Sequence, residues 1–355
     1  MQVRVLDQKD AKIWDVFVSS QPGSQILQSY EWGAFKSKCG WGHFVMAVEE
    51  AGEIKGGISI LTRRLPLIKR TVFYAPRGPI MKKNDPELFN ALMDGVLVEA
   101  AKMNAVALKI DPEIDESDSG YIQMLASKGF IRKKKQVQPR ATYFLDLTRP
   151  LDELLMSFEE KTRYNIRLSE KKGVKVSEES TQTGIDNFYK LYQETCSRNN
   201  FLIHPKSYYT KLKDILIENG MANVFTAKFR GVPVASIFIF RFGERVWYMY
   251  GASANEYRNM MPNHAIHWHM IKWAKEKGYK LYDLWGIPSN PKEGQPLYGV
   301  WRFKKGFNGE LKTWIGVYDL PFDGLVYKLF DRGVGIYQAV RSLIKKGRIS
   351  DSLSE

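Results

Sequence analysis

The order of hydrophobic and polar segments occurs twice along this chain. In the first half, alternating positions predict strands at Phe44–Glu49, Ile54–Thr62 and Thr71–Ala75. A helix from Asp85 to Met103 and a buried strand from Ala105 to Ile110 follow. This order predicts an antiparallel meander, and then a helix that crosses to a further strand.

The second half repeats these elements. The predicted segments are strands at Ala222–Phe229, Pro233–Arg241 and Arg245–Tyr250, a helix at Pro262–Lys277 and a strand at Lys280–Trp285. The spacing agrees as well, because Pro79 to Lys109 spans as many residues as Ser253 to Asp283. Each half is therefore expected to be α/β (of the α+β type) and to adopt the GNAT acyltransferase fold.

The domain boundaries follow from the same pattern. Pro150 breaks a predicted strand at Thr142–Leu147 before a new helix begins. We expect two GNAT-like domains packed side by side, residues 1–149 and 150–324, with a cleft between them. Residues 325–355 are expected to form a basic, amphipathic C-terminal tail that either docks on the second domain or touches anionic lipid.

Composition narrows the ligand class. The net charge of +14 over 355 residues favours phosphate-bearing partners: nucleic acid, a nucleotide-sugar or anionic lipid. The two cysteines are far apart, so neither a metal cluster nor a disulfide framework is expected. The N-terminal segment lacks an apolar targeting core and no apolar run is long enough to span a membrane, which predicts a cytoplasmic protein.

Two segments combine aromatic and cationic residues. They are Trp301–Phe307 and Ser29–Lys36, which we interpret as opposite walls of one cleft that suits an anionic, base-bearing ligand. The turns where GNAT enzymes bind the pyrophosphate of coenzyme A are Arg77–Lys82 and Arg258–Asn263 here. Methionine replaces the expected glycine and proline removes an amide donor, which argues against coenzyme A.

The chain resembles the Fem family of aminoacyltransferases, and its compact members in particular, because no coiled-coil arm is expected. The similarity rests on motifs in a fixed order: Gln28–Lys36, Tyr74–Pro79, Ile110–Pro112, Lys161–Arg167, Tyr248–Ser253, Tyr282–Gly286 and Phe303–Phe307. The resemblance implies a monomeric enzyme that needs no cofactor. It would transfer an amino acid from aminoacyl-tRNA to a side-chain amine of the stem peptide of a UDP-linked or lipid-linked peptidoglycan precursor.

The resemblance also assigns roles to residues. Lys36 would contact the precursor diphosphate, and Phe303 and Lys304 would meet the acceptor end of the aminoacyl-tRNA. His204 stands where the family often has an arginine, with Lys206 as a possible substitute. The full set expected at the precursor is Lys36, Trp32, Arg77, His204, Tyr208 and Tyr250; the set expected at the tRNA is Phe303, Lys305, Arg163 and Arg167.

The chemistry requires neither ATP nor metal, because an aminoacyl ester is already activated. Lys304 is the expected catalytic cation for the developing oxyanion. Asp111 and Asp283 end predicted buried strands and are candidates for a base. In the simpler interpretation Asp111, which precedes Pro112, only terminates a strand, and Lys36 and Lys304 are solvated lysines beside core aromatic residues.

Two other groups of basic residues have a structural interpretation and a functional one. Arg163 and Arg167 form either a solvated helix face or a strip that contacts RNA phosphates. His264, His267 and His269 cannot converge on one metal ion and are expected on a helix surface.

Two rival functions remain at this stage. One is an acyl-CoA-dependent N-acyltransferase that acts on a cell-surface sugar precursor. The other is a non-catalytic protein that binds RNA or lipid.

Overall fold

The computed structural model describes residues 1–22, 24–65, 69–81, 85–199, 201–295 and 297–333. The chain forms two compact units. Unit 1 contains residues 1–138 together with the described residues from Thr313 onward, and unit 2 contains Pro139–Lys312. In the described ranges, no helix has the length and apolar character needed to cross a membrane.

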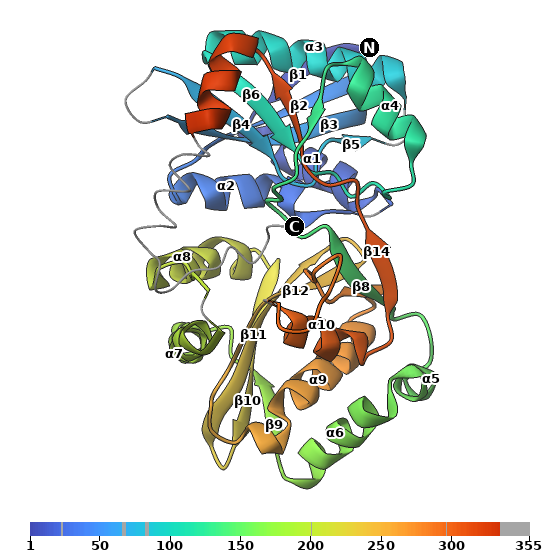
Figure 1. Ribbon diagram of the computed structural model, residues 1–355, viewed down its shortest axis with the longest axis vertical. Helices are drawn as coiled ribbons and strands as arrows, with labels where there is room; N and C mark the ends of the chain where they lie inside the picture. Colours follow the sequence, from blue (N-terminus) through green and yellow to red (C-terminus); the bar gives the residue numbers. More distant parts are fainter. Residues whose placement is uncertain (23, 66–68, 82–84, 200, 296, 334–355) are drawn as a thin grey trace. The chain divides into compact units, whose positions relative to one another are not determined.

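Unit 1 is built on a mixed sheet with the strand order β1-β2-β3-β4-β6-β15-β7, with β5 paired to β3 (Figure 1). Its strands are β1 (Gln2–Leu6), β2 (Gly42–Glu50), β3 (Glu53–Arg64), β4 (Thr71–Ala75), β5 (Ile80–Met81), β6 (Ala105–Ile110), β7 (Ile131–Arg132) and β15 (Tyr318–Pro321). Strands β2, β3 and β4 form the antiparallel meander, and β6 is parallel to β4.

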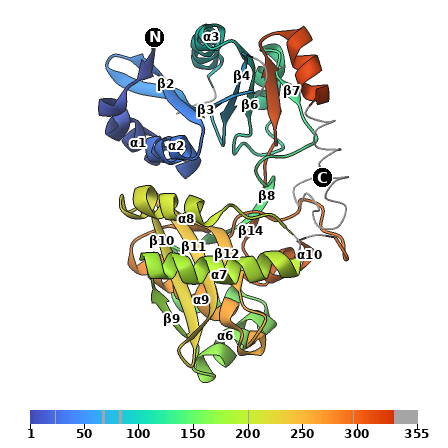
Figure 2. The ribbon, with the colours of Figure 1, turned by 90° about the vertical axis from the view of Figure 1, so that its left-hand side faces the viewer.

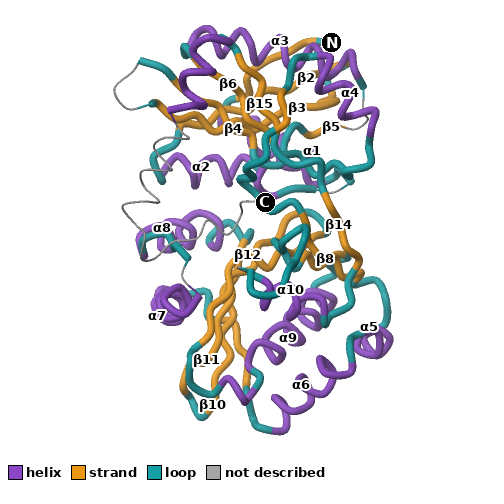
Figure 3. Tube along the Cα trace, viewed as in Figure 1, coloured by secondary structure: helices purple, strands orange, loops and turns teal. Residues whose placement is uncertain are grey.

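Helices cover both faces of this sheet (Figures 1 and 3). They are α1 (Ala11–Ser19), α2 (Tyr30–Lys38), α3 (Pro86–Lys102) and α4 (Ser119–Ser127), with 3-10 turns at Gln8–Asp10 and Ile26–Gln28. Helix α3 begins where the sequence predicts, because the Asp85 side chain accepts hydrogen bonds from the amides of Glu87 and Leu88. Its apolar face packs against the sheet and contributes Leu88, Phe89, Leu92, Met93, Val96 and Ala100 to the unit 1 core.

Unit 2 contains a second mixed sheet, with the order β14-β8-β13-β12-β11-β10-β9. Its strands are β8 (Ala141–Asp146), β9 (Lys175–Glu178), β10 (Ala222–Phe229), β11 (Val232–Phe242), β12 (Arg245–Ser253), β13 (Leu281–Asp283) and β14 (Glu310–Thr313). Strands β10, β11 and β12 form the meander, and β13 is parallel to β12.

The helices of unit 2 pack on both sides of the meander. They are α5 (Leu151–Ser157), α6 (Glu160–Lys171), α7 (Gln182–Asn199), α8 (Lys206–Leu212), α9 (Pro262–Glu276) and α10 (Tyr298–Lys305), with a π-helical turn at Lys213–Ile217 and a 3-10 turn, η4, at Arg258–Met260. Helix α7 crosses one face (Figure 2), and α9 lies on the other face with α6 packed against it.

The predicted duplication is confirmed. Each unit has a meander, a helix and a strand parallel to the last strand of the meander, which is the predicted mixed α/β fold. The point of separation differs from Pro150, because β8 pairs with β13 and belongs to the second sheet. Strand β15 comes late in the chain but pairs with β6 of the first sheet.

The beginning of the basic C-terminal stretch docks on unit 1, and not on the second domain as one of the two expectations had it. Residues 324–333 are helical. Tyr327 is buried against Val106 and Ala107, and its hydroxyl donates to Asp319. Residues 334–355, the rest of the expected amphipathic tail, lie outside the described residues.

Candidate active site

Lys304 is a buried cation near the end of α10 in unit 2. Only 4% of the residue is exposed. Its Nζ donates to the carbonyl oxygens of Trp285 (3.1 Å) and Gly286 (2.8 Å). The same Nζ lies 5.3 Å from the centre of the Tyr248 ring. The sequence motif identified this lysine, whereas its burial and its carbonyl partners come from the fold.

Burial changes the protonation of Lys304. Loss of solvent lowers the pKa of Lys304 to about 7, against the opposing effect of Asp283. The charged and neutral forms are therefore both accessible near neutral pH. With two N–H bonds directed at the carbonyls of Trp285 and Gly286, one position on Nζ is left for a ligand or a proton.

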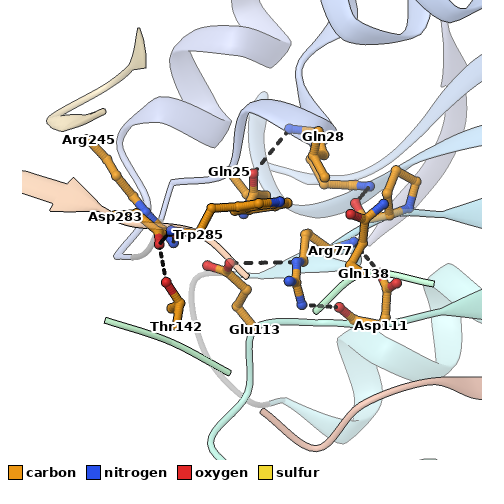
Figure 4. Close-up of polar contacts among 12 residues, drawn as sticks. Gln25, Gln28, Arg77, Asp111, Glu113, Gln138, Thr142, Arg245, Asp283 and Trp285 are labelled. Carbon is orange, nitrogen blue, oxygen red and sulfur yellow. Dashed lines mark hydrogen bonds and ion pairs between the residues drawn. The ribbon is translucent and has the colours of Figure 1, made fainter. Parts of the chain in front are cut away.

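Asp283 fixes the turn that carries these two carbonyls. Its carboxylate is fully buried, pairs with Arg245 and accepts a hydrogen bond from Thr142 (Figure 4). It also accepts from the amide of Trp285 at 2.7 Å, and Trp285 has a positive φ of 57°. These contacts suit a structural role for Asp283 behind Lys304 better than the expected role of a base.

Two histidines of α9 surround the same region. His267 is 1% exposed, and its Nδ1 lies 3.0 Å from the Tyr282 hydroxyl. Burial lowers the pKa of His267 to about 3 and that of His264 to about 4. The expectation that all three α9 histidines lie on a helix surface is therefore wrong for His267. In the described ranges, no group of His, Cys, Asp or Glu side chains is arranged to hold a metal ion.

Phe303 and Lys305 flank Lys304 on α10. Phe303 is half-buried and packs edge-on against His264 and His267 at 5.1 and 5.3 Å. Lys305 is exposed and lies 5.3 Å from the centre of the Trp301 ring. Phe303 is thus held in place on one side while part of it stays accessible.

Two sequence motifs of unit 2, Lys161–Arg167 and Phe303–Phe307, pack against each other. Gly306 lies so close to the hydroxyl of Thr162 on α6 that a Cβ atom would overlap it. The carbonyl of Gly306 also accepts a hydrogen bond from the Glu159 amide at 2.9 Å. The start of α6 is therefore anchored to the Lys304 segment.

Tyr208 and Tyr250 form a separate aromatic site on the α7 side of the sheet. Their hydroxyls are 3.4 Å apart, and the exposed ring of His204 stacks on Tyr208 at 3.9 Å. Lys206, considered as a substitute for arginine, pairs with Asp186 at 2.9 Å. These residues provide a flat aromatic surface rather than a bidentate phosphate clamp.

A bulge in β12 separates Tyr248 from Tyr250. The register between β11 and β12 shifts at this point, and Met249 is the extra residue. Alternation along a regular strand would place both tyrosines on one face. Instead Tyr248 contacts His267 on the α9 side, and Tyr250 contacts Tyr192 on the α7 side.

Arg163 and Arg167 both lie on α6 but differ in exposure. Arg163 is half-buried and its guanidinium donates to the carbonyls of Met156 and Phe158 at the end of α5. Arg167 is exposed. Arg163 therefore has a clear structural role, and Arg167 is the more accessible cation.

In unit 1, Lys36 lies among aromatic rings at the end of α2. Its Nζ is 5.8 Å from the ring centres of both Trp32 and Phe35 and 6.0 Å from that of Trp41. Arg63 approaches the same Trp41 ring at 5.2 Å. Burial, and to a smaller extent Arg63, lowers the pKa of Lys36. The sequence reasoning missed Arg63, although Trp41 and the Arg63–Arg64 pair were signals available in the chain.

Arg77 and Asp111 form a buried polar network in unit 1 (Figure 4). Asp111 accepts from the Arg77 amide and the Tyr74 hydroxyl, both at 2.8 Å. The Arg77 guanidinium lies 3.6 Å from Glu113. Burial raises the pKa of Asp111 against the effect of Arg77. With both carboxylate oxygens engaged and 1% exposure, Asp111 suits a structural role better than that of a base.

Comparisons with known proteins cover almost the whole chain. The sequence model of the FemAB family matches residues 10–128, 126–230 and 217–332. The lipid II:glycine glycyltransferases of Staphylococcus haemolyticus and of Staphylococcus aureus strain MRSA252 are 29% and 28% identical over 392 aligned residues, which cover 90% of this chain and 93% of each relative.

Solved structures show the same fold. The crystal structure of FemX matches with a TM-score of 0.85 at 26% identity, and the match covers 93% of this chain and 99% of FemX. A tandem GNAT protein from the clavulanic acid biosynthesis pathway has a TM-score of 0.54 at 11% identity, with 91% and 99% coverage. The second likeness concerns the fold alone and supports two GNAT-like units.

Proposed function

Because the chain belongs to the FemAB family, we propose that it transfers an amino acid from aminoacyl-tRNA to a side-chain amine in the stem peptide of a peptidoglycan precursor. The general part of this proposal is aminoacyl transfer to a peptidoglycan precursor. It is supported by relatives named lipid II:glycine glycyltransferases, which align over 90% of the chain. The RNA donor and the identity of the acceptor amine are the finer parts of the proposal.

The observation that carries the proposal is the environment of Lys304. A buried cation held by two carbonyl oxygens has a fixed position and one free direction. In the reaction, the acceptor amine attacks the ester carbonyl, a C–N bond forms, and the C–O bond to the terminal ribose breaks. Lys304 would stabilise the negative charge that develops on the carbonyl oxygen, and the ribose oxygen would leave with a proton.

Phe303 and Lys305 support an RNA donor. A half-exposed ring beside the catalytic cation can stack on a terminal base, which is a common way of binding single-stranded nucleic acid. Lys305 adds an exposed positive charge one residue further on. The high net charge of +14 is consistent with this type of ligand.

The Lys36 site in unit 1 supports binding of a diphosphate. Lys36 and Arg63 lie near one tryptophan ring, so two positive charges are close together in a partly desolvated place. We assign this pair to the diphosphate of the precursor, where charge-assisted hydrogen bonds are strong. Tyr208 and Tyr250 of unit 2 are assigned to the sugar or peptide portion, because their hydroxyl groups lie together beside the exposed His204 ring.

A peripheral contact with the membrane is a further part of the proposal. Leu325 and Leu329 are highly exposed on the helix of residues 324–333, and the exposed cations Lys328 and Arg332 lie on the same helix. Apolar side chains between cations suit the surface of an anionic bilayer. Such a contact would favour a lipid-linked acceptor over a soluble UDP-linked one.

The test is a transfer assay with purified protein and a series of radiolabelled aminoacyl-tRNAs. UDP-linked and undecaprenyl-linked precursors are supplied separately, and the products are separated by chromatography. Label on the precursor peptide from at least one aminoacyl-tRNA is the expected result. Transfer from an aminoacyl thioester of coenzyme A, with none from any aminoacyl-tRNA, would contradict the proposal.

A further inference from the structure

A basic pocket of about 690 Å³ opens on the surface of unit 2, and one of its lining residues, Met260, belongs to the Arg258–Asn263 turn. It is formed by the turn between α6 and β9, the tight turn between β10 and β11, and η4. Its lining residues are Lys171, Lys172, Gly173, Lys175, Lys228, Phe229, Arg230, Gly231 and Met260. Five of the nine are cations and none is acidic, so the pocket suits an anion.

Most of this charge is not neutralised within the described parts of the chain. Lys228 pairs with Glu179. For Lys171, Lys172, Lys175 and Arg230, the described residues provide no ion pair, and all four are exposed. Arg230 lies 5.3 Å from the Phe229 ring, which Tyr257 contacts from another side at 5.1 Å. Several unpaired cations beside aromatic rings are typical of a nucleic-acid contact.

Helix α6 connects this pocket with the Lys304 segment. Thr162 at the start of α6 packs against Gly306, two residues after Lys304, and Lys171 and Lys172 at its end line the pocket. Ten helical residues span about 15 Å. Successive phosphates of a stacked strand are about 3.4 Å apart along the axis, so this length corresponds to about four or five nucleotides. Arg167, exposed on α6, lies between the two ends.

We propose that the basic pocket binds backbone phosphates of the donor RNA, about four or five nucleotides from the aminoacyl ester. This inference rests on the proposed function, because it places the end of the same RNA at Lys304. The pocket contacts phosphates and reads no sequence, since cations without base-specific amides dominate its lining. An anionic membrane is the less suitable ligand, because Phe229 is buried, Met260 is half-buried and the lining offers no exposed apolar side chain for insertion.

The test compares two double variants with the same change in charge. Lys172→Gln/Arg230→Gln removes two cations of the pocket, and Lys12→Gln/Lys190→Gln removes two exposed cations elsewhere. The affinity for uncharged tRNA is measured by fluorescence anisotropy at several salt concentrations. For the pocket variant we expect an affinity at least about tenfold lower, and a salt dependence weakened by about 1.5 in the log–log slope. The control variant should match wild type.

A second substrate separates this inference from the proposed function. A 3′-aminoacylated dinucleotide is too short to reach the pocket, so its transfer rate should be unchanged in the pocket variant, whereas KM for aminoacyl-tRNA rises. Three results for the pocket variant would overturn the inference. They are a transfer rate that falls as much with the dinucleotide as with aminoacyl-tRNA, a tRNA affinity and salt slope equal to those of wild type, and a loss of binding to anionic vesicles alone. If the pocket variant binds tRNA more weakly but wild type shows no transfer activity, the pocket would still be an RNA-binding site and the proposed reaction would be refuted.

Discussion

At the scale of single residues, Lys304 shows how the fold changes the chemistry of one side chain. An exposed lysine is almost fully charged at neutral pH, whereas burial lowers the pKa of Lys304 to about 7. The two carbonyl contacts hold the amine in place whether it is charged or neutral. A group of this kind can respond to charge that develops on a nearby ester.

The lowered pKa makes a prediction about stability. Below about pH 7 Lys304 is charged in both states, so the folded protein carries the full cost of burying the charge. Between about pH 7 and 10.5 the unfolded chain holds a proton that the folded protein has lost, and the free energy of unfolding therefore rises with pH. Compared with Lys304→Met, wild type should gain stability across this window, by up to a few kcal/mol. Urea unfolding at pH 6.5, 8 and 9.5 measures this difference, and a constant difference would contradict the shift.

Lys36 gives a prediction for the other unit. Replacing it with methionine keeps much of the volume between Trp32 and Trp41 but removes the charge. One lost charge-assisted hydrogen bond should weaken binding of a UDP-linked precursor about tenfold to a hundredfold, with tRNA affinity unchanged. Calorimetric titration measures both affinities. Lys38→Met, on the exposed side of the same helix, is the control, and an equal effect of the two variants would remove Lys36 from the diphosphate site.

At the scale of elements, the contact between α6 and the end of α10 aligns the Lys304 segment. Gly306 has helical dihedral angles, so the backbone conformation allows alanine, and the main obstacle to its Cβ atom is the Thr162 hydroxyl, with the Phe303 carbonyl oxygen 3.2 Å away. Gly306→Ala should therefore lower the free energy of unfolding by about 1–3 kcal/mol, the usual cost of overpacking. Thr162→Ala/Gly306→Ala should recover most of this loss, because the blocking hydroxyl is gone. Thermal unfolding of the two single variants and the double variant measures these free energies. If the effects of the two single substitutions add in the double variant, the two residues do not interact.

The elements also show what a sequence pattern can and cannot predict. The predicted bounds of β4, β6 and β10 agree with the structure, because each has clear alternation or apolar content between turn residues. Strand β15 was missed, since it has four residues and depends on pairing with β6, about 200 positions earlier. The bulge at Met249 also has no local signal, although it decides which face Tyr248 and Tyr250 occupy.

The candidate site was predictable to a similar extent. The motif around Phe303–Phe307 indicated Lys304, because cations beside aromatic residues have a recognisable composition. Its carbonyl partners could not be found in this way, since they depend on the positive φ of Trp285 and on the ion pair between Asp283 and Arg245. The basic pocket could not be predicted either, because it is formed by three segments that are far apart in the sequence: the turns after α6 and β10, and η4.

At the scale of the whole molecule, duplication provides two versions of one fold with different side chains. Unit 1 offers the Lys36 and Arg63 pair, and unit 2 offers Lys304, Phe303 and the basic pocket. In the proposed function, the excess positive charge therefore binds more than one phosphate-bearing partner. In that function, binding of the two substrates by different units would explain why the motifs of the two halves are different.

The exposed leucines of residues 324–333 give a prediction for the membrane contact. Leu325→Ser/Leu329→Ser should reduce co-flotation with vesicles of anionic lipid, because less apolar surface can be buried in the bilayer. The buried Tyr327 is unchanged in this variant, so the docked helix should stay in place. Vesicles of neutral lipid are the control. Undiminished flotation with anionic vesicles would exclude these leucines from membrane binding.

The central claim is that Lys304 of unit 2 takes part in aminoacyl transfer. Its most direct test is the single-turnover rate of Lys304→Met with aminoacyl-tRNA and precursor both saturating. We predict a rate about a hundredfold to a thousandfold below that of wild type, the cost of one lost oxyanion stabiliser, with the affinities for both substrates retained. A rate within threefold of wild type under these conditions would contradict it and would reduce Lys304 to a structural or RNA-binding residue.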